Sequence, residues 1–246
     1  MAISVGLVDM TNRMHDQAHG LRCLMGKGPE RLVAVVGSSP GVGATSVARN
    51  LAAALMQQGK DALVLEESGH GQRVHERQAG RVVLMDAALN EQGALSPLAL
   101  KADHVLIVLQ PSAESITAAY VCIKTLHRAH ALRHLRVLVN FSSDVAHAQR
   151  IMLNLATTTR RYLAIELESA GSVVADPQLA KAQRLNSTAV EASRISPAAV
   201  QLRSIAAELL RWPRHAPALP VALPMPGTQR HDLRLDAAAH FTPQFR

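Results

Sequence analysis

Residues 37–46, GSSPGVGATS, carry the residue types that this chain would need to bind phosphate. They follow an apolar, β-branched run at residues 32–36 and lead into a helical pattern at residues 44–58. In a strand, glycine-rich turn and helix of this order, backbone N–H groups curl around an anion and the helix N-terminus adds partial positive charge. We therefore expect a phosphate-binding loop. Its candidate contacts are Gly37, Gly41, Gly43, Ala44, Thr45 and Ser46.

This loop departs from the usual pattern in its charge. The common motif G-x-x-x-x-G-K-[ST] places a lysine on the β- and γ-phosphates and a hydroxyl on magnesium. Gly37, Gly43 and Thr45 match the motif, but Ala44 stands at the lysine position. The backbone cradle and the metal-binding hydroxyl are therefore expected without the main cation.

A carboxylate suited to magnesium ends another predicted strand. Residues 81–86, RVVLMD, are an apolar run that finishes in Asp86, which is the Walker B pattern. An acid placed there beside a phosphate-binding loop would hold magnesium directly or through water. Thr45 and Asp86 are therefore the candidate metal ligands.

Further polar residues follow other predicted strands. Glu66 and Ser68 come after residues 61–65, and Asn140 comes after residues 135–139. In open α/β sheets ligands bind beyond the carboxyl ends of the strands. We therefore expect these residues to converge with the loop and Asp86 at one edge of a sheet.

Buried strands that alternate with helices predict the fold class. The pattern is typical of an α/β protein with a mostly parallel sheet, flanked by helices on both faces and joined by right-handed crossovers. The further expected elements are a strand at residues 105–109, helices at residues 113–129, 145–162 and 197–212, and two short runs, 165–167 and 173–175, around a turn at Gly171.

The chain divides into an arm, a domain and a tail. Residues 1–30 form an arm in which Met14, Ala18, Leu21 and Met25 share one helical face. That helix either packs on its own domain or lies in the groove of a partner. Residues 31–212 form the domain. Residues 213–246 are rich in proline and predict a flexible tail, in which residues 231–241 could form a weak helix, with binding to a membrane surface disfavoured.

Composition narrows the function classes. The chain has 246 residues and a formal net charge of +7, but its Lys and Arg residues form no block, so an arginine-rich protein without a nucleic-acid or membrane surface is favoured. Aromatic residues make up only 2%, which argues against RNA recognition by base stacking. Two distant cysteines suit a reducing cytosol, and no apolar run reaches the ~18 residues of a membrane span.

The order of motifs resembles the MinD/ParA class of P-loop ATPases, and within it the FlhG family of flagellar regulators, also called FleN or YlxH. One feature is the D-Q-A-x-x-L-R arm motif ahead of the ATPase domain. Its residues here are Asp16, Gln17, Ala18, Leu21 and Arg22. The other is the order of the core motifs over about residues 13–212. These are Asp86, residues 102–108, Pro111, Asn140, Asp176 and Ser196 followed by Pro197.

The resemblance implies a MinD-like P-loop NTPase fold and a role in flagellar number and placement. It implies that the arm stimulates an FlhF-like GTPase, and that ATP or ADP with magnesium is the cofactor. Rotor-ring proteins or transcription regulators, and a second copy of the chain, are the further partners that it implies. The expected location is the cytoplasm, with peripheral contact at the inner face of the membrane near the flagellar pole or base.

The departures from that family concern its catalytic groups. Where the family reads K-G-G-V-G-K-T, residues 39–45 read SPGVGAT, so both lysines are missing. The family's D-x-D falls on Glu66 and Ser68, and the switch glycine falls on Asn90. The segment between residues 66 and 86 is short, so we expect one internal strand to be missing. These losses predict weak or absent ATP hydrolysis and a domain that works mainly as a protein-binding scaffold.

Other functions remain open at this point. The chain could be a working ATP-switched ATPase of the MinD/ParA type that uses an unorthodox loop. It could also resemble the MinD-like proteins of cellulose synthesis, although those are not expected to carry the arm. DNA segregation is disfavoured because the positive charge is scattered, so direct nucleic-acid binding is not expected.

Overall fold

The computed structural model describes residues 31–67 and 80–213. The arm with its motif residues, Ser68 and the proline-rich tail lie outside the described residues. The predicted division into arm, domain and tail therefore stays a prediction.

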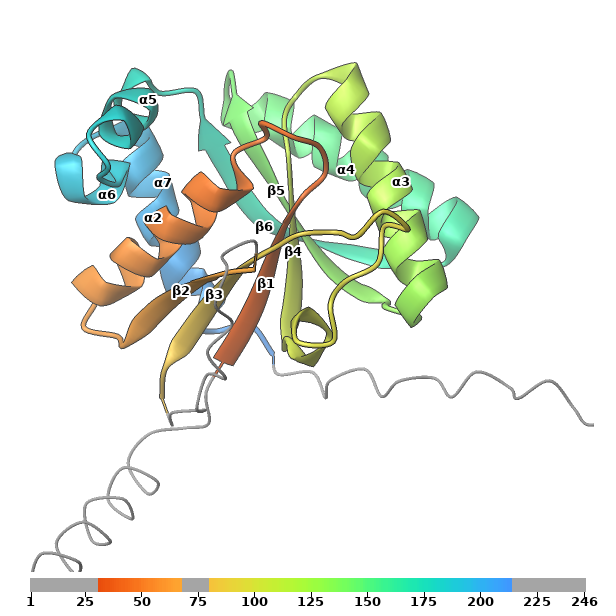
Figure 1. The fold of residues 1–246 in the computed structure, drawn as a ribbon. Coiled ribbons are helices and arrows are strands. Elements are labelled where there is room, and N and C mark those ends of the chain that lie inside the picture. Colours follow the sequence, from red (N-terminus) through yellow and green to blue (C-terminus); the bar gives the residue numbers. More distant parts are fainter. Residues whose placement is uncertain (1–30, 68–79, 214–246) are drawn as a thin grey trace, which may run out of the picture.

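The described chain folds around one six-stranded sheet (Figure 1). The strand order is β2-β3-β1-β4-β5-β6, and every neighbouring pair is parallel. The strands are β1 (Arg31–Gly37), β2 (Ala62–Glu66), β3 (Val82–Ala87), β4 (His104–Leu109), β5 (His134–Ser142) and β6 (Glu166–Val174). The predicted α/β class and parallel sheet are confirmed.

The two central strands explain why the sequence reads as continuous apolar runs. All of β4 and residues 31–36 of β1 are buried, because helices cover both faces of the sheet. A strand buried on both sides has no polar face, so its sequence does not alternate. After β1, the chain builds β2 and β3 on one side of β1. It then crosses to the other side of β1 and adds β4, β5 and β6 outward. The direction in which strands are added therefore reverses between β1 and β4.

Four main helices form the outer layers. Helices α2 (Ala44–Gln57) and α7 (Pro197–Leu209) pack on one face, and α3 (Ala113–His130) and α4 (Val145–Leu163) pack on the other. Two short helices, α5 (Pro177–Arg184) and α6 (Ala189–Ala192), join β6 to α7, and η1 (Ala99–Lys101) precedes β4. Among the described helices, none is both long and apolar enough to span a bilayer.

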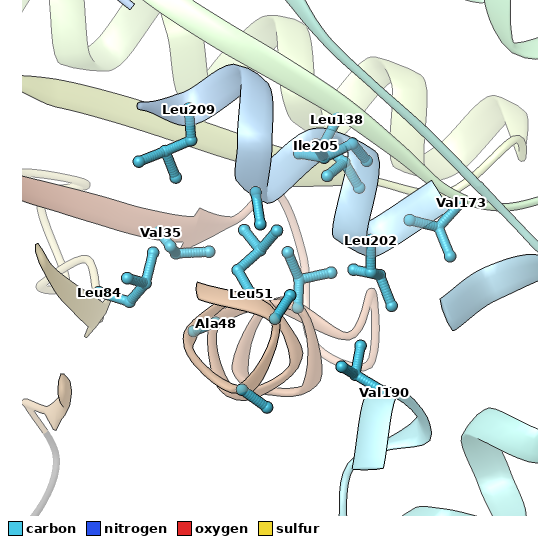
Figure 2. Packing of buried hydrophobic residues seen from close by; sticks show 14 of the residues in the cluster. Val35, Ala48, Leu51, Leu84, Leu138, Val173, Val190, Leu202, Ile205 and Leu209 are labelled. Atoms are coloured by element: carbon cyan, nitrogen blue, oxygen red, sulfur yellow. The ribbon is translucent and has the colours of Figure 1, made fainter. Parts of the chain in front are cut away.

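Leu51 of α2 lies at the centre of the first hydrophobic layer. Its side chain is fully buried, and Figure 2 shows it facing Val35 and Leu84 of the sheet and Leu202 of α7. Because α2 begins directly after the phosphate-loop glycines, this packing fixes the position of the helix N-terminus relative to the sheet.

The predicted turn at Gly171 is wrong. β6 is one continuous strand whose pairing with β5 skips Ala170, so the irregularity is a β-bulge. Gly171 has φ +115°, and a Cβ added there would lie 3.0 Å from Ile205 of α7. Glycine is required there by both the backbone conformation and the close helix, and a bulge keeps the strand paired where a turn would end it.

The described chain ends meet at the amino edge of the sheet. Arg31 donates from Nη1 to the carbonyl oxygens of Leu209 and Trp212, at 2.6 and 3.0 Å. The guanidinium of Arg136 stacks 4.2 Å from the Trp212 ring centroid and pairs with Glu168. The predicted helix of residues 197–212 ends at Leu209, and Trp212 is held by these side chains instead.

Candidate functional site

The loop between β1 and α2 is built around two glycines in the left-handed region. Gly41 has φ +80°, and Gly43 has φ +87° and caps the N-terminus of α2. No side chain caps this helix, and its first turn holds no acid. The first N–H groups of α2 therefore keep their capacity to bind an anion.

Side chains from β5 and the end of β4 hold this loop in place. Asn140 donates from Nδ2 to the carbonyl oxygen of Val42 at 2.9 Å, and Gln110 donates from Nε2 to that of Gly41 at 2.8 Å. With these carbonyl groups engaged on the sheet side, the loop is fixed at the switch in strand order, where open α/β sheets bind ligands.

Gly43 is required by the space around it as well as by its backbone conformation. A Cβ added there would lie 2.6 Å from Asn140 Nδ2 and 3.3 Å from a ring carbon of Phe141. The loop therefore approaches β5 too closely for any other residue at this position.

The predicted metal pair is in contact. Thr45 donates from Oγ1 to Asp86 Oδ2 at 2.6 Å. Both oxygens are ligands that magnesium prefers, and Mg²⁺ sites commonly use one or two protein groups with water and phosphate oxygens. Among the described residues no group of three or more His, Cys, Asp or Glu residues could hold a metal.

The missing loop cation is not replaced nearby. Residues 37–46 contain no Lys or Arg. Arg49 lies one turn further along α2, but its Nε donates to Glu66 Oε1 at 3.2 Å and the two side chains form an ion pair. Glu66 therefore neutralises Arg49.

Glu67 is a carboxylate that the sequence reasoning missed. Its backbone N–H donates to the Asp86 carbonyl oxygen at 3.2 Å, and its Oε2 accepts from the Ala88 N–H at 2.9 Å. Its Oε1 is buried without a hydrogen-bond partner among the described residues. Strand alternation gave no signal for this contact, because Glu66 is the register partner of Asp86 and faces the same side of the sheet. Glu66 and Asp86 both face α2, where they contact Arg49 and Thr45, whereas Glu67 is tied to β3 through the backbone groups of Asp86 and Ala88.

The end of β5 contains a second unexpected feature. Phe141 has φ +55°, a left-handed conformation that is unusual for a bulky residue and is strained. The preceding residue, Asn140, has a buried Oδ1 without a hydrogen-bond partner in the described chain. Asn140 also lies two residues before the end of β5, although we expected it directly after the strand. Strain and an unpaired amide oxygen next to Gly43 are typical of a ligand site.

Comparisons with solved structures decide the fold. MinD from Aquifex aeolicus superposes with a TM-score of 0.56 at 17% identity, over 74% of this chain and 98% of that one. MinD from Pyrococcus horikoshii, complexed with Mg-ADP, gives 0.54 at 14% identity, over 73% and 96%. A ParA family ATPase from Chlorobium tepidum gives 0.51 at 11% identity, over 72% and 98%. The fold is that of the MinD and ParA ATPases.

Sequence comparison adds a relative to this MinD/ParA fold. The antiactivator FleN of Pseudomonas aeruginosa strain PAO1 is 28% identical over 132 residues, which cover 54% of this chain and 47% of FleN. The match thus spans about half of that relative's length. No family model matches the chain. The predicted resemblance to FleN-type regulators and MinD/ParA ATPases is confirmed as a resemblance.

The residues of this MinD/ParA-type loop fit a nucleotide in part. The uncapped start of α2 suits the phosphates, and Thr45 with Asp86 suits magnesium. When bound, such a nucleotide would bring negative charge that the loop itself does not balance. The loop therefore offers backbone N–H groups and two oxygen ligands but no cationic side chain.

Proposed function

We propose that this chain regulates flagellar assembly, number and placement through protein contacts, and that its MinD-like domain has weak or no ATPase activity. The resemblance to FleN and the MinD/ParA fold support the flagellar role. In this proposal the arm residues Asp16, Gln17, Leu21 and Arg22 engage and activate an FlhF-like GTPase.

The observation that carries the loss of ATPase activity is the uncharged loop. Removing one partner of a buried, hydrogen-bonded charge pair typically costs about 2–5 kcal/mol, or roughly 30- to 4,000-fold in affinity. Here Ala44 replaces the lysine, and Arg49 is paired with Glu66. Backbone N–H groups, Thr45 and Asp86 are what remains to hold the nucleotide, so binding is weak and water activation has no dedicated carboxylate.

The remaining partners belong to the same proposal. A MinD-like domain suits a homodimer, and rotor-ring or transcription-regulator proteins are the further candidates. Contact with the membrane is weak or indirect, at the inner face near the flagellar base. We propose no direct binding of nucleic acid.

The GTPase contact is tested with the whole chain. GTP hydrolysis by an FlhF-like GTPase is measured alone, with the full chain, and with the double variant Leu21→Ala/Arg22→Ala. We expect stimulation by the full chain that the double variant loses, while Arg13→Ala, an arginine of the same arm outside the motif, retains it. Equal rates with and without the full chain would contradict the role of the arm.

A second candidate function is a working ATP-switched dimer, which the intact contact between Thr45 and Asp86 favours. Size-exclusion chromatography with light scattering, with and without Mg-ATP, separates the two candidates. ATP-dependent dimerisation with measurable turnover would support the switch and contradict the scaffold. Deleting residues 1–30 in cells and measuring motility against cellulose output separates both from a role in cellulose synthesis.

A further inference from the structure

A groove of about 550 Å³ runs along the outer edge of the sheet at β6. One wall is α4, the other is α7, and β6 with the end of β5 forms the floor; Figure 1 shows the two helices on opposite sides of β6. Its lining residues include Val145, Met152, Leu153, Gly171, Gln201 and Ile205. The groove lies apart from the phosphate loop, on the far side of β4 and β5.

The α4 wall exposes large apolar side chains. Leu153 is 66% exposed and Val145 is 48% exposed, and Met152 between them lines the groove as well. Apolar side chains gathered along a hollow on a protein surface are typical of a site that another segment covers.

The floor of the groove is an edge strand. In the described sheet β6 pairs only with β5. The Val174 N–H donates to Gln201 Oε1 of α7 at 2.8 Å, so a side chain takes the bond that a neighbouring strand would make. An edge strand with a groove above it accepts an extended segment through backbone hydrogen bonds, and alternate side chains fill the groove.

The chain carries a segment with the required alternation in its tail. Residues 219–226 read LPVALPMP. The odd positions are the large apolar residues Leu219, Val221, Leu223 and Met225, and the even positions are Pro220, Ala222, Pro224 and Pro226. In an extended strand successive N–H groups point to opposite sides. Proline has no N–H group, and all the prolines of this segment stand at even positions, so every missing N–H group lies on the same side.

This arrangement matches an outermost strand. The odd residues keep all of the N–H groups that would face β6, and their large side chains would all face one wall. The even residues would place proline on the solvent side, which is where sheets tolerate it and where it blocks pairing with another chain.

We propose that residues 219–225 of this chain's own tail add to β6 as an antiparallel strand and fill the groove between α4 and α7. The seven residues from Trp212 to Leu219 span about 23 Å when extended. Trp212 packs on Arg136, the register partner of Glu168 in β6, and Val174 lies about 20 Å further along that strand. The tail is therefore long enough to reach the far end of β6 and to return along it.

The antiparallel direction follows from the handedness of connections. α7 packs on the same face as α2, whereas the right-handed crossovers that lead outward to β5 and β6 use α3 and α4 on the other face. A parallel strand beyond β6, reached through α7, would need a left-handed crossover, which proteins nearly always avoid.

Hydrogen exchange of the β6 amides tests this proposal. We expect the amides of Ser172 and its neighbours to exchange roughly tenfold more slowly in the full chain than in a chain that ends at residue 213. Equal exchange in the two chains would overturn the proposal, and circular dichroism checks that the shortened chain is folded.

Two proline variants in the full chain make the test specific. Val221→Pro removes an N–H that faces β6, so it should raise β6 exchange to the level of the shortened chain. Ala222→Pro removes an N–H that faces solvent, so protection should persist. Equal effects of the two variants would overturn the strand, as would protection that requires residues 1–30. Protection that grows with protein concentration would assign the groove to a second copy and overturn the intramolecular form.

Discussion

The hydroxyl of Thr45 and the carboxylate of Asp86 lie 2.6 Å apart, although 41 residues separate them in the chain. Thr45 and Asp86 supply the oxygen atoms that would bind magnesium, whereas Ala44 supplies no positive charge for the phosphates. The missing cation is therefore a point at which function can be restored.

Replacing Ala44 with lysine should raise the affinity for Mg-ATP. A charge-assisted hydrogen bond contributes about 1.5–3 kcal/mol, which corresponds to roughly 10- to 150-fold. Isothermal titration calorimetry of Ala44→Lys and of the neutral control Ala44→Met measures the effect. A gain as large in Ala44→Met as in Ala44→Lys would show that charge is not what the loop lacks.

Shortening Leu51 should destabilise the domain strongly. Leu51 is fully buried between α2, α7 and the sheet, and Leu→Ala changes in such cores cost roughly 2–5 kcal/mol. Met56 lies on the same helix but is 52% exposed, so Met56→Ala is the matched control and should cost less than about 1 kcal/mol. Urea unfolding of both variants gives the two values, and similar values would contradict the packing described for α2.

Asp176 should contribute stability that depends on pH. Burial alone raises the pKa of Asp176, but hydrogen bonds from the Ser196 hydroxyl and the Gln178 and Ala198 N–H groups outweigh it and hold the pKa below its ordinary value. Because the folded pKa lies below the unfolded one, this stability is present above about pH 4 and lost as pH falls through the folded pKa.

The variant Asp176→Asn tests this dependence. The stability difference between wild type and Asp176→Asn should be larger at pH 7 than at pH 3, measured by denaturant unfolding at both values. The exposed acid Glu91 supplies the control variant Glu91→Gln, for which no such change is expected. A difference that is constant across this range would rule out the charge of Asp176 as its source.

Cys122 should be inert in the native protein. Its side chain is buried in α3, and burial raises the pKa of the thiol to about 11. In a Cys23→Ser background, a thiol reagent at pH 8 should modify Cys122 only on unfolding, because the thiolate is the reacting form. Modification of the folded protein at the rate of a small free thiol would contradict the burial of this helix face.

The elements that sequence reasoning predicted best are those with strong local signals. The apolar runs of β1 and β4 and the glycine-rich turn before α2 identify a parallel sheet with a loop at its carboxyl edge, and the structure places Asp86 and Asn140 there as expected. Parallel strands bring their carboxyl ends to one edge whatever their sequence separation.

The features that were missed depend on distant contacts. At the bulge, Gly171 lies against Ile205, from a helix 34 residues later in the chain, and that contact has no local signal. The left-handed conformation of Phe141 falls near the end of β5, and its neighbours in the sequence give no sign of it. Glu67 was missed because its contact with the Ala88 N–H depends on the pairing of β2 with β3, which the adjacent residues do not reveal.

Arg31 binds the carbonyl groups of Leu209 and Trp212, so the arm and the tail join the domain at the pole opposite the loop. The seven residues of β1 separate the two poles by about 23 Å. A ligand bound at the Arg31 pole would therefore leave the loop uncovered. β1 and α2, which flank the loop, both run between the two poles.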